Sequence, residues 1–344
     1  MEIRIFSPPR RGVAALVAIA VCAAVGCGEP ARREDSLKLG GYSVVREVFH
    51  EGIIPAFKKR WRERTGREPV FGESYSSSGA QARSIASGFD ADVAALSHPG
   101  DMEMLVKAGK VASTWRNGPN QGILTHSLVV IGHREGNPRG IKDWSDLAKP
   151  GVAVLYPDPK TSGGARWNVN AIHGAALLKA GADGPARDLM EKIQANVVNM
   201  DPSGRRSLAN FGRSGDVDAV VTYENELLLR AREGEPIPYV VPPATLLIES
   251  PFAIVGPSVD KHGNRELVEA FVEFLSSAEA QAIFVEYGFR PLDSSTEDLP
   301  GRPEPAEVFT IDDLGGWGKV ADELYSSHGL WTAIAARVVT SRGR

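Results

Sequence analysis

The stretch VAVLYPDPKTSGGARWNVNAIHGAALLKAG, residues 152–181, decides the fold class of this 344-residue chain. An apolar run leads into small and polar residues, and a helical pattern follows at once. Strand, loop and helix in this order predict an α/β unit whose loop lies at the carboxyl end of a strand. Gly163 and Gly164 leave the backbone bare where the helix begins, so we expect a ligand to meet that backbone.

The same strand–loop–helix order recurs along the chain. SYSSSGAQ places Ser78 at a helix start, and DPSGRRS places Gly204 at another. In VVTYENELLL, Tyr223 stands at the join, and SLKLGGYSVV ends its strand near Ser43. This alternation predicts an α/β fold with ligand loops at strand ends.

The first residues read as an export signal. Arg4, Arg10 and Arg11 precede an apolar run at 12–24 that ends in AVGC. The pattern predicts a lipoprotein signal peptide over residues 1–26, a lipidated Cys27 and a tether over residues 27–35. A plain signal peptide or a single membrane anchor stays open, although the apolar run is short for a span.

Cysteine and charge exclude several classes of function. Besides Cys27 the chain has only Cys22, inside the predicted leader, so we expect neither a disulfide nor a cysteine metal site. Residues 1–26 carry three Arg and one Glu, so 36 of 39 basic and 42 of 43 acidic residues remain, a net charge of −6. An acidic chain without a basic stripe argues against nucleic acid. The histidines lack metal-ligand spacing, so we expect no metal and no cofactor.

The helix starts predict an anion site. The first N–H groups of a helix have no intrahelical partner and lie at the positive end of its dipole. Ser162 can cap its helix or face a ligand, and glycines let an oxygen approach the amides. One such loop can be merely a capped helix, but several in one chain indicate convergence on a small oxyanion. No Gly-Lys-Ser/Thr pattern is present, which argues against a nucleotide phosphate.

With these residues assembled, the chain resembles the periplasmic sulfate-binding proteins of ABC importers. The resemblance covers nearly the whole mature chain and is carried by PDPKTSGGARWN, GFDADVAALS, EGNPRGIKDWSDLAKPGV, VVTYENELLL and FTIDDLGGW. It implies a two-lobed periplasmic-binding-protein type II fold, with mixed sheets flanked by helices and the ligand in the interlobe cleft. Residues 36–124 and 246–344 would form one lobe, and residues 125–245 the other.

The resemblance also implies which groups bind the anion. Ser162 would give its hydroxyl and amide, and Gly163 and Gly164 their backbone N–H groups. Ser78 matches a serine that gives its hydroxyl. Arg166 matches an arginine that holds the loops without touching the anion.

Three further positions differ from the family in residue type, and two of them would contribute only a backbone N–H group to the anion. Ser43 matches an aspartate, and Gly204 an alanine, that each contribute a backbone N–H. Tyr223 stands where the family has tryptophan, and a hydroxyl can donate as the indole does but can also accept. In the similar molybdate-binding proteins a tyrosine contacts the oxyanion, so molybdate or tungstate stays open beside sulfate and thiosulfate.

A site made of donors alone disfavours phosphate, whose proton demands an acceptor. No carboxylate lies within the matched loops, and Glu73, Asp158 and Glu224 flank them; one turned inward would make phosphate a candidate. A sulfate-ester hydrolase or phosphatase and a non-transport lipoprotein remain alternatives. LGGWGKVADELY, residues 314–325, is expected to be a packing turn without a ligand. We expect an exported monomer that partners an ABC permease.

Overall fold

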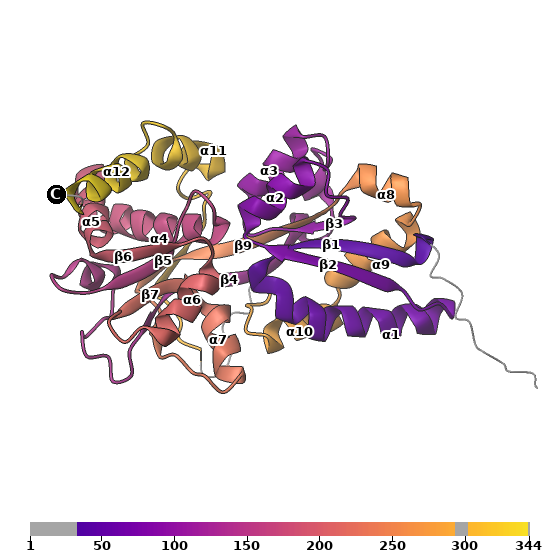
Figure 1. The fold of residues 1–344 in the computed structure, drawn as a ribbon, viewed down its shortest axis with the longest axis horizontal. Helices are drawn as coiled ribbons and strands as arrows, with labels where there is room; N and C mark the ends of the chain where they lie inside the picture. The colour runs from indigo at the N-terminus through magenta and orange to yellow at the C-terminus, as the bar shows by residue number, and fades with distance from the viewer. Residues whose placement is uncertain (1–32, 293–301, 343–344) are drawn as a thin grey trace, which may run out of the picture. The chain divides into compact units, whose positions relative to one another are not determined.

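The computed structural model describes residues 33–292 and 302–342, which belong to one compact unit (Figure 1). The predicted signal peptide, Cys27 and most of the predicted tether lie outside the described residues. Residues 33–35, which end that tether, form a short 3₁₀ turn directly before the first strand.

The first lobe is built on three parallel strands, with β1 paired to both β2 and β3. Its elements are β1 (Ser36–Tyr42), η2 (Ser43–Val45), η3 (Val48–Ile53), α1 (Ile54–Thr65), β2 (Val70–Ser76), α2 (Ser78–Ala86), β3 (Val93–Ala95), α3 (Pro99–Lys107), α8 (Gly256–His262), α9 (Arg265–Leu275) and α10 (Ala278–Glu286). Its core gathers aromatic rings: Phe57 packs edge-on against Phe271, with ring centroids 5.0 Å apart. The buried residues of α1, Ile54, Phe57 and Trp61, recur at helical spacing because they face this core.

The second lobe repeats the arrangement, with β5 parallel to both β6 and β7. Its elements are β5 (Val154–Pro157), α4 (Gly163–Ala180), α5 (Asp183–Asn196), β6 (Val197–Asp201), α6 (Gly204–Arg213), β7 (Ala219–Tyr223), α7 (Glu224–Arg232) and β8 (Tyr239–Val240). The sequence pattern alone predicts no element over the stretch that forms α5.

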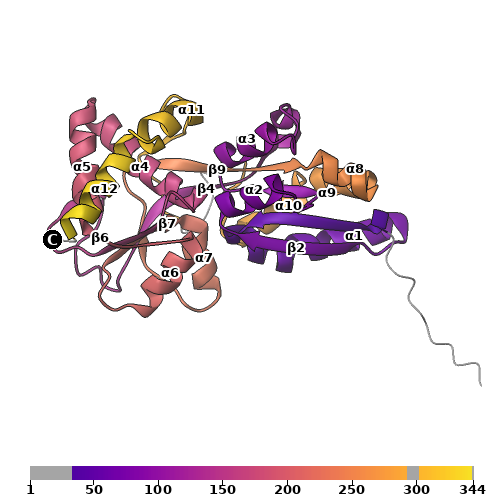
Figure 2. The same cartoon turned by 45° about the horizontal axis from the view of Figure 1, so that its top comes forward.

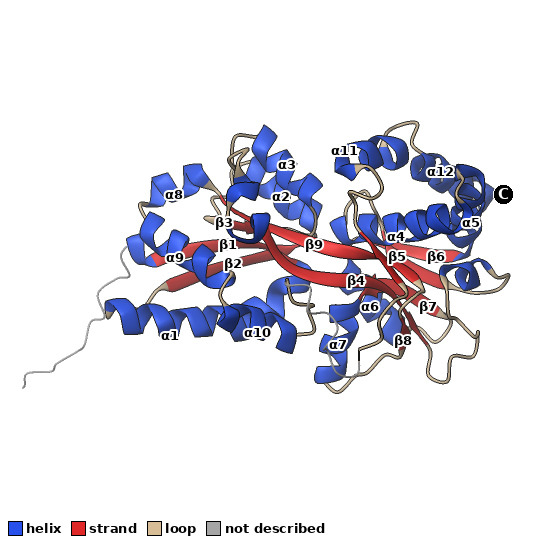
Figure 3. Ribbon diagram, turned by 180° about the vertical axis from the view of Figure 1, so that it is seen from behind, coloured by secondary structure: helices blue, strands red, loops and turns tan. Residues whose placement is uncertain are grey.

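Two long strands join the lobes, β4 (Ile123–His133) and β9 (Ala244–Ile254). They run antiparallel to each other; β4 continues along β7 in the second lobe, and β9 along β3 in the first. Figure 3 shows both strands running between the two groups of helices. Among the described residues the strand order is β2-β1-β3-β9-β4-β7-β5-β6, a mixed sheet as predicted.

The C-terminal elements correct the predicted lobe boundary. They are β10 (Glu307–Phe309), α11 (Gly316–Val320) and α12 (Leu330–Arg342), and α12 packs against α5 (Figures 1 and 2). The strand β10 pairs with the second-lobe end of β9. Phe309 of β10 also packs against Gly174 of α4, where an added Cβ would lie 2.4 Å from the Phe309 ring. The last part of the range 246–344 therefore packs with the second lobe, not the first.

Helix length also bears on membrane insertion. Across residues 33–292 and 302–342, no helix combines the length and the apolar character that crossing a bilayer requires.

Candidate anion-binding site

A small cavity of about 20 Å³ lies where loops of both lobes meet. One water needs roughly 10–15 Å³ on this measure, so the guest has only a few atoms. The lining residues are Tyr42, Ser43, Val44, Ser77, Ser78, Pro157, Ser162, Gly164, Asn168, Ser203, Gly204, Thr222, Tyr223 and Glu226. Every residue predicted to touch the anion is among them except Gly163.

Helix starts surround this cavity. The short helix η2 begins at Ser43, α2 at Ser78 and α6 at Gly204, while Ser162 and Tyr223 are the N-caps of α4 and α7. Backbone N–H groups in a first helical turn lack intrahelical acceptors and carry the positive end of the dipole. The cavity wall therefore offers donors and a positive field without a basic side chain in direct contact.

The second-lobe serine caps its helix. Ser162 has extended backbone, with φ −110° and ψ 119°, and its Oγ accepts a hydrogen bond from Ala165 N at 3.4 Å. Only 5% of Ser162 is exposed. Its hydroxyl proton has no acceptor among the described residues' hydrogen bonds, so that proton is available to a guest in the cavity.

The first-lobe serine is bound differently. Ser78 is the first residue of α2, as the sequence predicts, and Ser77 is the N-cap. The Ser78 Oγ donates to Asp101 Oδ2 at 2.5 Å and accepts from Ser97 N at 2.9 Å. Because a hydroxyl has one proton, Ser78 can donate to the anion, as predicted, only if its hydroxyl turns away from Asp101. The Ser78 side chain is committed inside the first lobe in this structure.

Gly163 has a role that the sequence analysis did not foresee. A Cβ at this position would lie 2.7 Å from His98 Cδ2 and 3.1 Å from Asp101 Oδ2, both in the first lobe. The missing side chain therefore lets the two lobes approach, rather than only clearing a path for the anion. A Cβ at Gly164 would instead lie 3.3 Å from the Tyr223 hydroxyl, in the cavity wall.

His98 and the predicted packing turn meet behind the cavity. The His98 ring stacks on Trp317 at 4.5 Å and its Nε2 lies 3.3 Å from Asp101 Oδ2. Trp317 also packs edge-on against Trp167 at 4.9 Å. Burial lowers the pKa of His98 to about 4, partly opposed by Asp101, so the ring is neutral near pH 7. Helix α11, which contains Trp317 and occupies part of the predicted turn, thus packs at the junction of the lobes.

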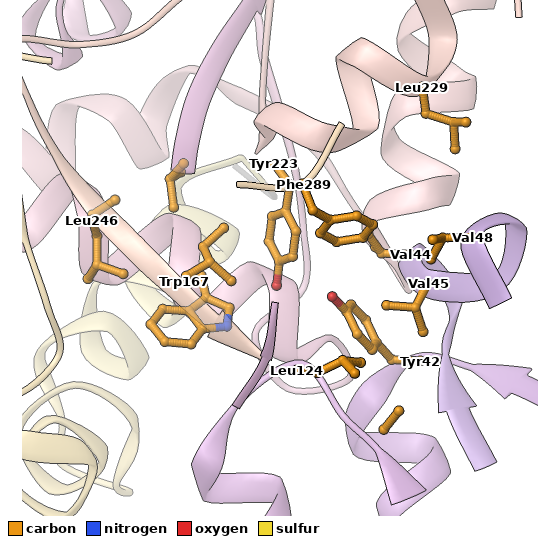
Figure 4. Close-up of a cluster of buried hydrophobic side chains, with 14 of the residues drawn as sticks. Tyr42, Val44, Val45, Val48, Leu124, Trp167, Tyr223, Leu229, Leu246 and Phe289 are labelled. Atoms are coloured by element: carbon orange, nitrogen blue, oxygen red, sulfur yellow. The ribbon is translucent and has the colours of Figure 1, made fainter. Parts of the chain in front are cut away.

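Tyrosine hydroxyls come to the cavity from both lobes. Figure 4 shows the rings of Tyr42 and Tyr223 with their oxygens turned toward the middle of the view, beside Trp167. The Tyr223 hydroxyl lies 2.8 Å from Ser97 Oγ, and the Tyr42 hydroxyl 2.9 Å from Ser250 Oγ. Burial raises the pKa of Tyr223 well above its ordinary value of 10, so its hydroxyl keeps its proton.

The carboxylates next to the site are not those the sequence singled out. Glu73 bonds to His50 and Tyr75, Asp158 accepts from its own loop at Lys160 N, and Glu224 pairs with Arg290.

Glu226 instead forms part of the cavity wall, which corrects the expectation of a wall without carboxylates. Its Oε1 accepts from Arg205 Nη2 at 2.9 Å, while Oε2 is buried without a hydrogen bond among the described residues. Burial raises the pKa of Glu226, and the Arg205 charge opposes that rise.

Arg205 also ties the lobes together. Its two terminal nitrogens bond to the Glu47 carboxylate of the first lobe at 3.0 and 2.8 Å. Each of the three charged residues lies one to four positions after a predicted ligand in the sequence: Glu47 after Ser43, Arg205 after Gly204, and Glu226 after Tyr223. One guanidinium therefore holds three of the cavity loops in register.

Arg166 lies where the sequence analysis expected a loop-holding residue. Its Nε donates to Pro159 O at 3.2 Å, and its guanidinium lies 5.0 Å above the Tyr325 ring. Arg166 is absent from the cavity lining. Within the part of the chain that the structure describes, no group of His, Cys, Asp and Glu side chains is arranged to hold a metal ion.

Sequence comparison finds two sets of relatives. The model of bacterial extracellular solute-binding proteins matches residues 50–290. A sulfate-binding protein of Synechococcus elongatus is 39% identical over 335 residues, 94% of this chain and 94% of the relative. A sulfate-binding protein of Escherichia coli K12 is 35% identical, over 86% of this chain and 92% of the relative. A thiosulfate-binding protein of Pseudomonas aeruginosa is 31% identical, over 89% and 97%.

Solved structures agree with the fold. The sulfate-binding protein SubI of Mycobacterium tuberculosis H37Rv superposes with a TM-score of 0.77 and is 35% identical, covering 85% of this chain and 99% of that one. A periplasmic thiamin-binding protein superposes with a TM-score of 0.63 at 14% identity, covering 88% and 96%, which speaks for the fold alone.

Proposed function

Because this chain belongs to the bacterial extracellular solute-binding proteins, in the group that contains the sulfate-binding proteins, we propose that it binds sulfate and delivers it to an ABC importer. The two-lobed type II fold and the family membership support this function. The observation that carries the choice of ligand class is the small cavity between the lobes, surrounded by helix starts.

Uncharged donors suit a sulfate dianion. Burying a dianion costs far more than burying a neutral group unless its oxygens find donors, and sulfate carries no proton that needs an acceptor near pH 7. A hydrogen bond to a charged group contributes about 1.5–3 kcal/mol. About seven such bonds can offset dehydration and leave roughly 8 kcal/mol, which corresponds to micromolar binding.

We assign the contacts as the sequence predicts, with one change. Ser162 gives its hydroxyl, Gly163, Gly164 and Gly204 give backbone N–H groups, and Tyr223 gives its hydroxyl. The backbone N–H groups of Ser43 and Ser78 complete the set. The Ser78 hydroxyl joins them only by leaving Asp101, whose Oδ2 accepts its hydrogen bond at 2.5 Å.

Two observations define the competing anions. The thiosulfate-binding relative at 31% identity makes thiosulfate the second candidate. The free Glu226 Oε2 in the cavity wall is an acceptor that a proton-bearing anion such as hydrogen phosphate can use.

Titration calorimetry with sulfate, thiosulfate, molybdate and phosphate tests the assignment. We expect sulfate to bind tightest. A tenfold preference for any rival, about 1.4 kcal/mol, would reject sulfate as the ligand.

The remaining proposals concern the cellular setting. We propose export by the 1–26 signal peptide, anchoring through a lipid on Cys27, a monomeric protein and a membrane permease as partner. The relatives named above are binding proteins, and we propose binding without turnover here too. Release of sulfate from a sulfate ester by the purified protein would contradict this, and a Cys27→Ser variant that stays in the membrane fraction would contradict the anchor.

A further inference from the structure

Ser97 is a buried first-lobe residue that contacts second-lobe residues beside the cavity. It is fully buried, between β3 and α3 of the first lobe, and each of its polar groups has a partner. Ser97 N donates to Ser78 Oγ at 2.9 Å, and Ser97 O accepts from Trp167 Nε1 at 2.7 Å. Its Oγ lies 2.8 Å from the Tyr223 hydroxyl. Ser97 ends the motif GFDADVAALS, but the sequence does not show which groups its hydroxyl and backbone meet.

The bond between Ser97 and Tyr223 can run in either direction, and only one direction suits an anion. Each hydroxyl has a single proton and can also accept. If Tyr223 donates to Ser97, the Tyr223 lone pairs face the cavity and repel an anion. If Ser97 donates to Tyr223, the Tyr223 proton is free to point into the cavity. A bound anion, as the strongest acceptor present, accepts a hydrogen bond from the Tyr223 hydroxyl and leaves Ser97 as the donor of the serine–tyrosine pair.

We propose that Ser97 is a positioning residue for anion specificity, because its hydroxyl donates to Tyr223 and so commits the Tyr223 proton to the anion. This rests on the proposed function. Held in this way, Tyr223 can only donate toward the cavity, which suits the unprotonated sulfate dianion. Without Ser97 the Tyr223 hydroxyl can turn either its proton or a lone pair inward. It then accommodates the P–OH group of hydrogen phosphate, and discrimination falls.

Variants at position 223 distinguish this role of Ser97 from a general effect on packing. An indole N–H donates and cannot accept, so a tryptophan at 223 needs no neighbour to fix its direction. A phenylalanine has no hydroxyl to fix at all. The loss caused by Ser97→Ala should therefore depend on which residue occupies position 223.

The test is calorimetric titration of sulfate and of phosphate into the parent, Ser97→Ala, Tyr223→Trp, Tyr223→Phe and the two double variants, with thermal unfolding to verify folding. We expect Ser97→Ala to weaken sulfate binding roughly three- to tenfold and to lower the sulfate-to-phosphate affinity ratio. In the Tyr223→Trp and Tyr223→Phe backgrounds, Ser97→Ala should change that ratio less than about twofold. Should the tryptophan variant fail to fold, the phenylalanine pair gives the same cycle.

A control is Ser277→Ala, which removes a serine hydroxyl that caps α10 outside the cavity lining and should leave the ratio unchanged. Equal losses from Ser97→Ala in all three backgrounds, or an unchanged ratio in the Tyr223 background, would overturn the role of Ser97. Failure of the parent to bind sulfate would overturn the proposed function and this role together.

Discussion

The two serine–glycine junctions, at Ser78 in the first lobe and at Ser162 in the second, look alike in sequence and behave differently in the structure. Both stand between a strand and a helix, and both line the cavity. Ser162 is an N-cap whose hydroxyl proton stays available, whereas Ser78 stands one residue after its N-cap and donates its hydroxyl hydrogen bond to Asp101. A one-residue shift relative to the helix start thus decides whether a serine faces the guest or its own lobe.

The largest effect should come from placing a charge at the second-lobe junction. Ser162→Asp keeps a favoured N-cap, so the fold should persist. Its carboxylate would face a dianion, and one pair of like charges about 4 Å apart costs about 4 kcal/mol at an effective dielectric constant near 20. We therefore expect at least a thousandfold weaker sulfate binding by calorimetry.

Ser277→Asp is the matched control, because Ser277 caps α10 in the same way, outside the cavity lining. It should bind sulfate as the parent does. Parent-like binding by Ser162→Asp would show that this junction does not face the anion.

Glycine substitutions compare the same two junctions by steric contact. Gly163→Ala would bring a Cβ within 2.7 Å of the buried His98 ring, which is stacked on Trp317. The lobes must then part, and we expect sulfate affinity to fall at least tenfold. Gly79→Ala would meet Arg83 Nη1, the end of a flexible side chain, at 3.2 Å. It should weaken binding less than threefold; an equal loss at both positions would refute the interlobe role of Gly163.

The sequence could predict helix starts but not the partner of each hydroxyl. Ser43, Ser78, Gly204 and Tyr223 were found because strand, turn and helix signals are local. The contacts of Asp101, Ser97 and Trp317 could not be predicted, because they form only through tertiary packing of short strands and distant helices. The C-terminal helices were assigned to the wrong lobe for the same reason, since β10 joins β9 at its second-lobe end.

Removing the hydroxyl of Ser78 or of Ser162 should lower the free energy of unfolding by different amounts. Ser78→Ala leaves Asp101 Oδ2 and the Ser97 N–H without this partner, in a buried place. An unsatisfied buried group costs about 1–3 kcal/mol, so we expect a loss of about 2 kcal/mol in the free energy of unfolding. Ser162→Ala removes only a helix cap, at about 1 kcal/mol. Urea unfolding of both variants without ligand measures the difference, and a larger loss for Ser162→Ala would reverse our assignment of the two serines.

Acid should weaken the first-lobe junction through His98, the partner of Asp101. Burial lowers the pKa of His98 in the folded state to about 4, against an ordinary value of 6.5. Between these values the unfolded chain binds a proton that the folded chain does not, so stability falls as pH drops from about 6.5 to about 4. The expected slope is at most about 1.4 kcal/mol per pH unit.

His126 and His173 also have pKa values lowered by burial, so the contribution of His98 must be read as a difference between proteins. His98→Asn keeps a favoured N-cap for α3 and does not titrate. Urea unfolding of parent and variant between pH 7 and pH 4 should give a shallower pH dependence for the variant. Identical slopes would mean that His98 takes up a proton as readily in the folded protein as in the unfolded chain. The hydrogen bond from Ser78 to Asp101 would then not depend on a neutral His98 ring.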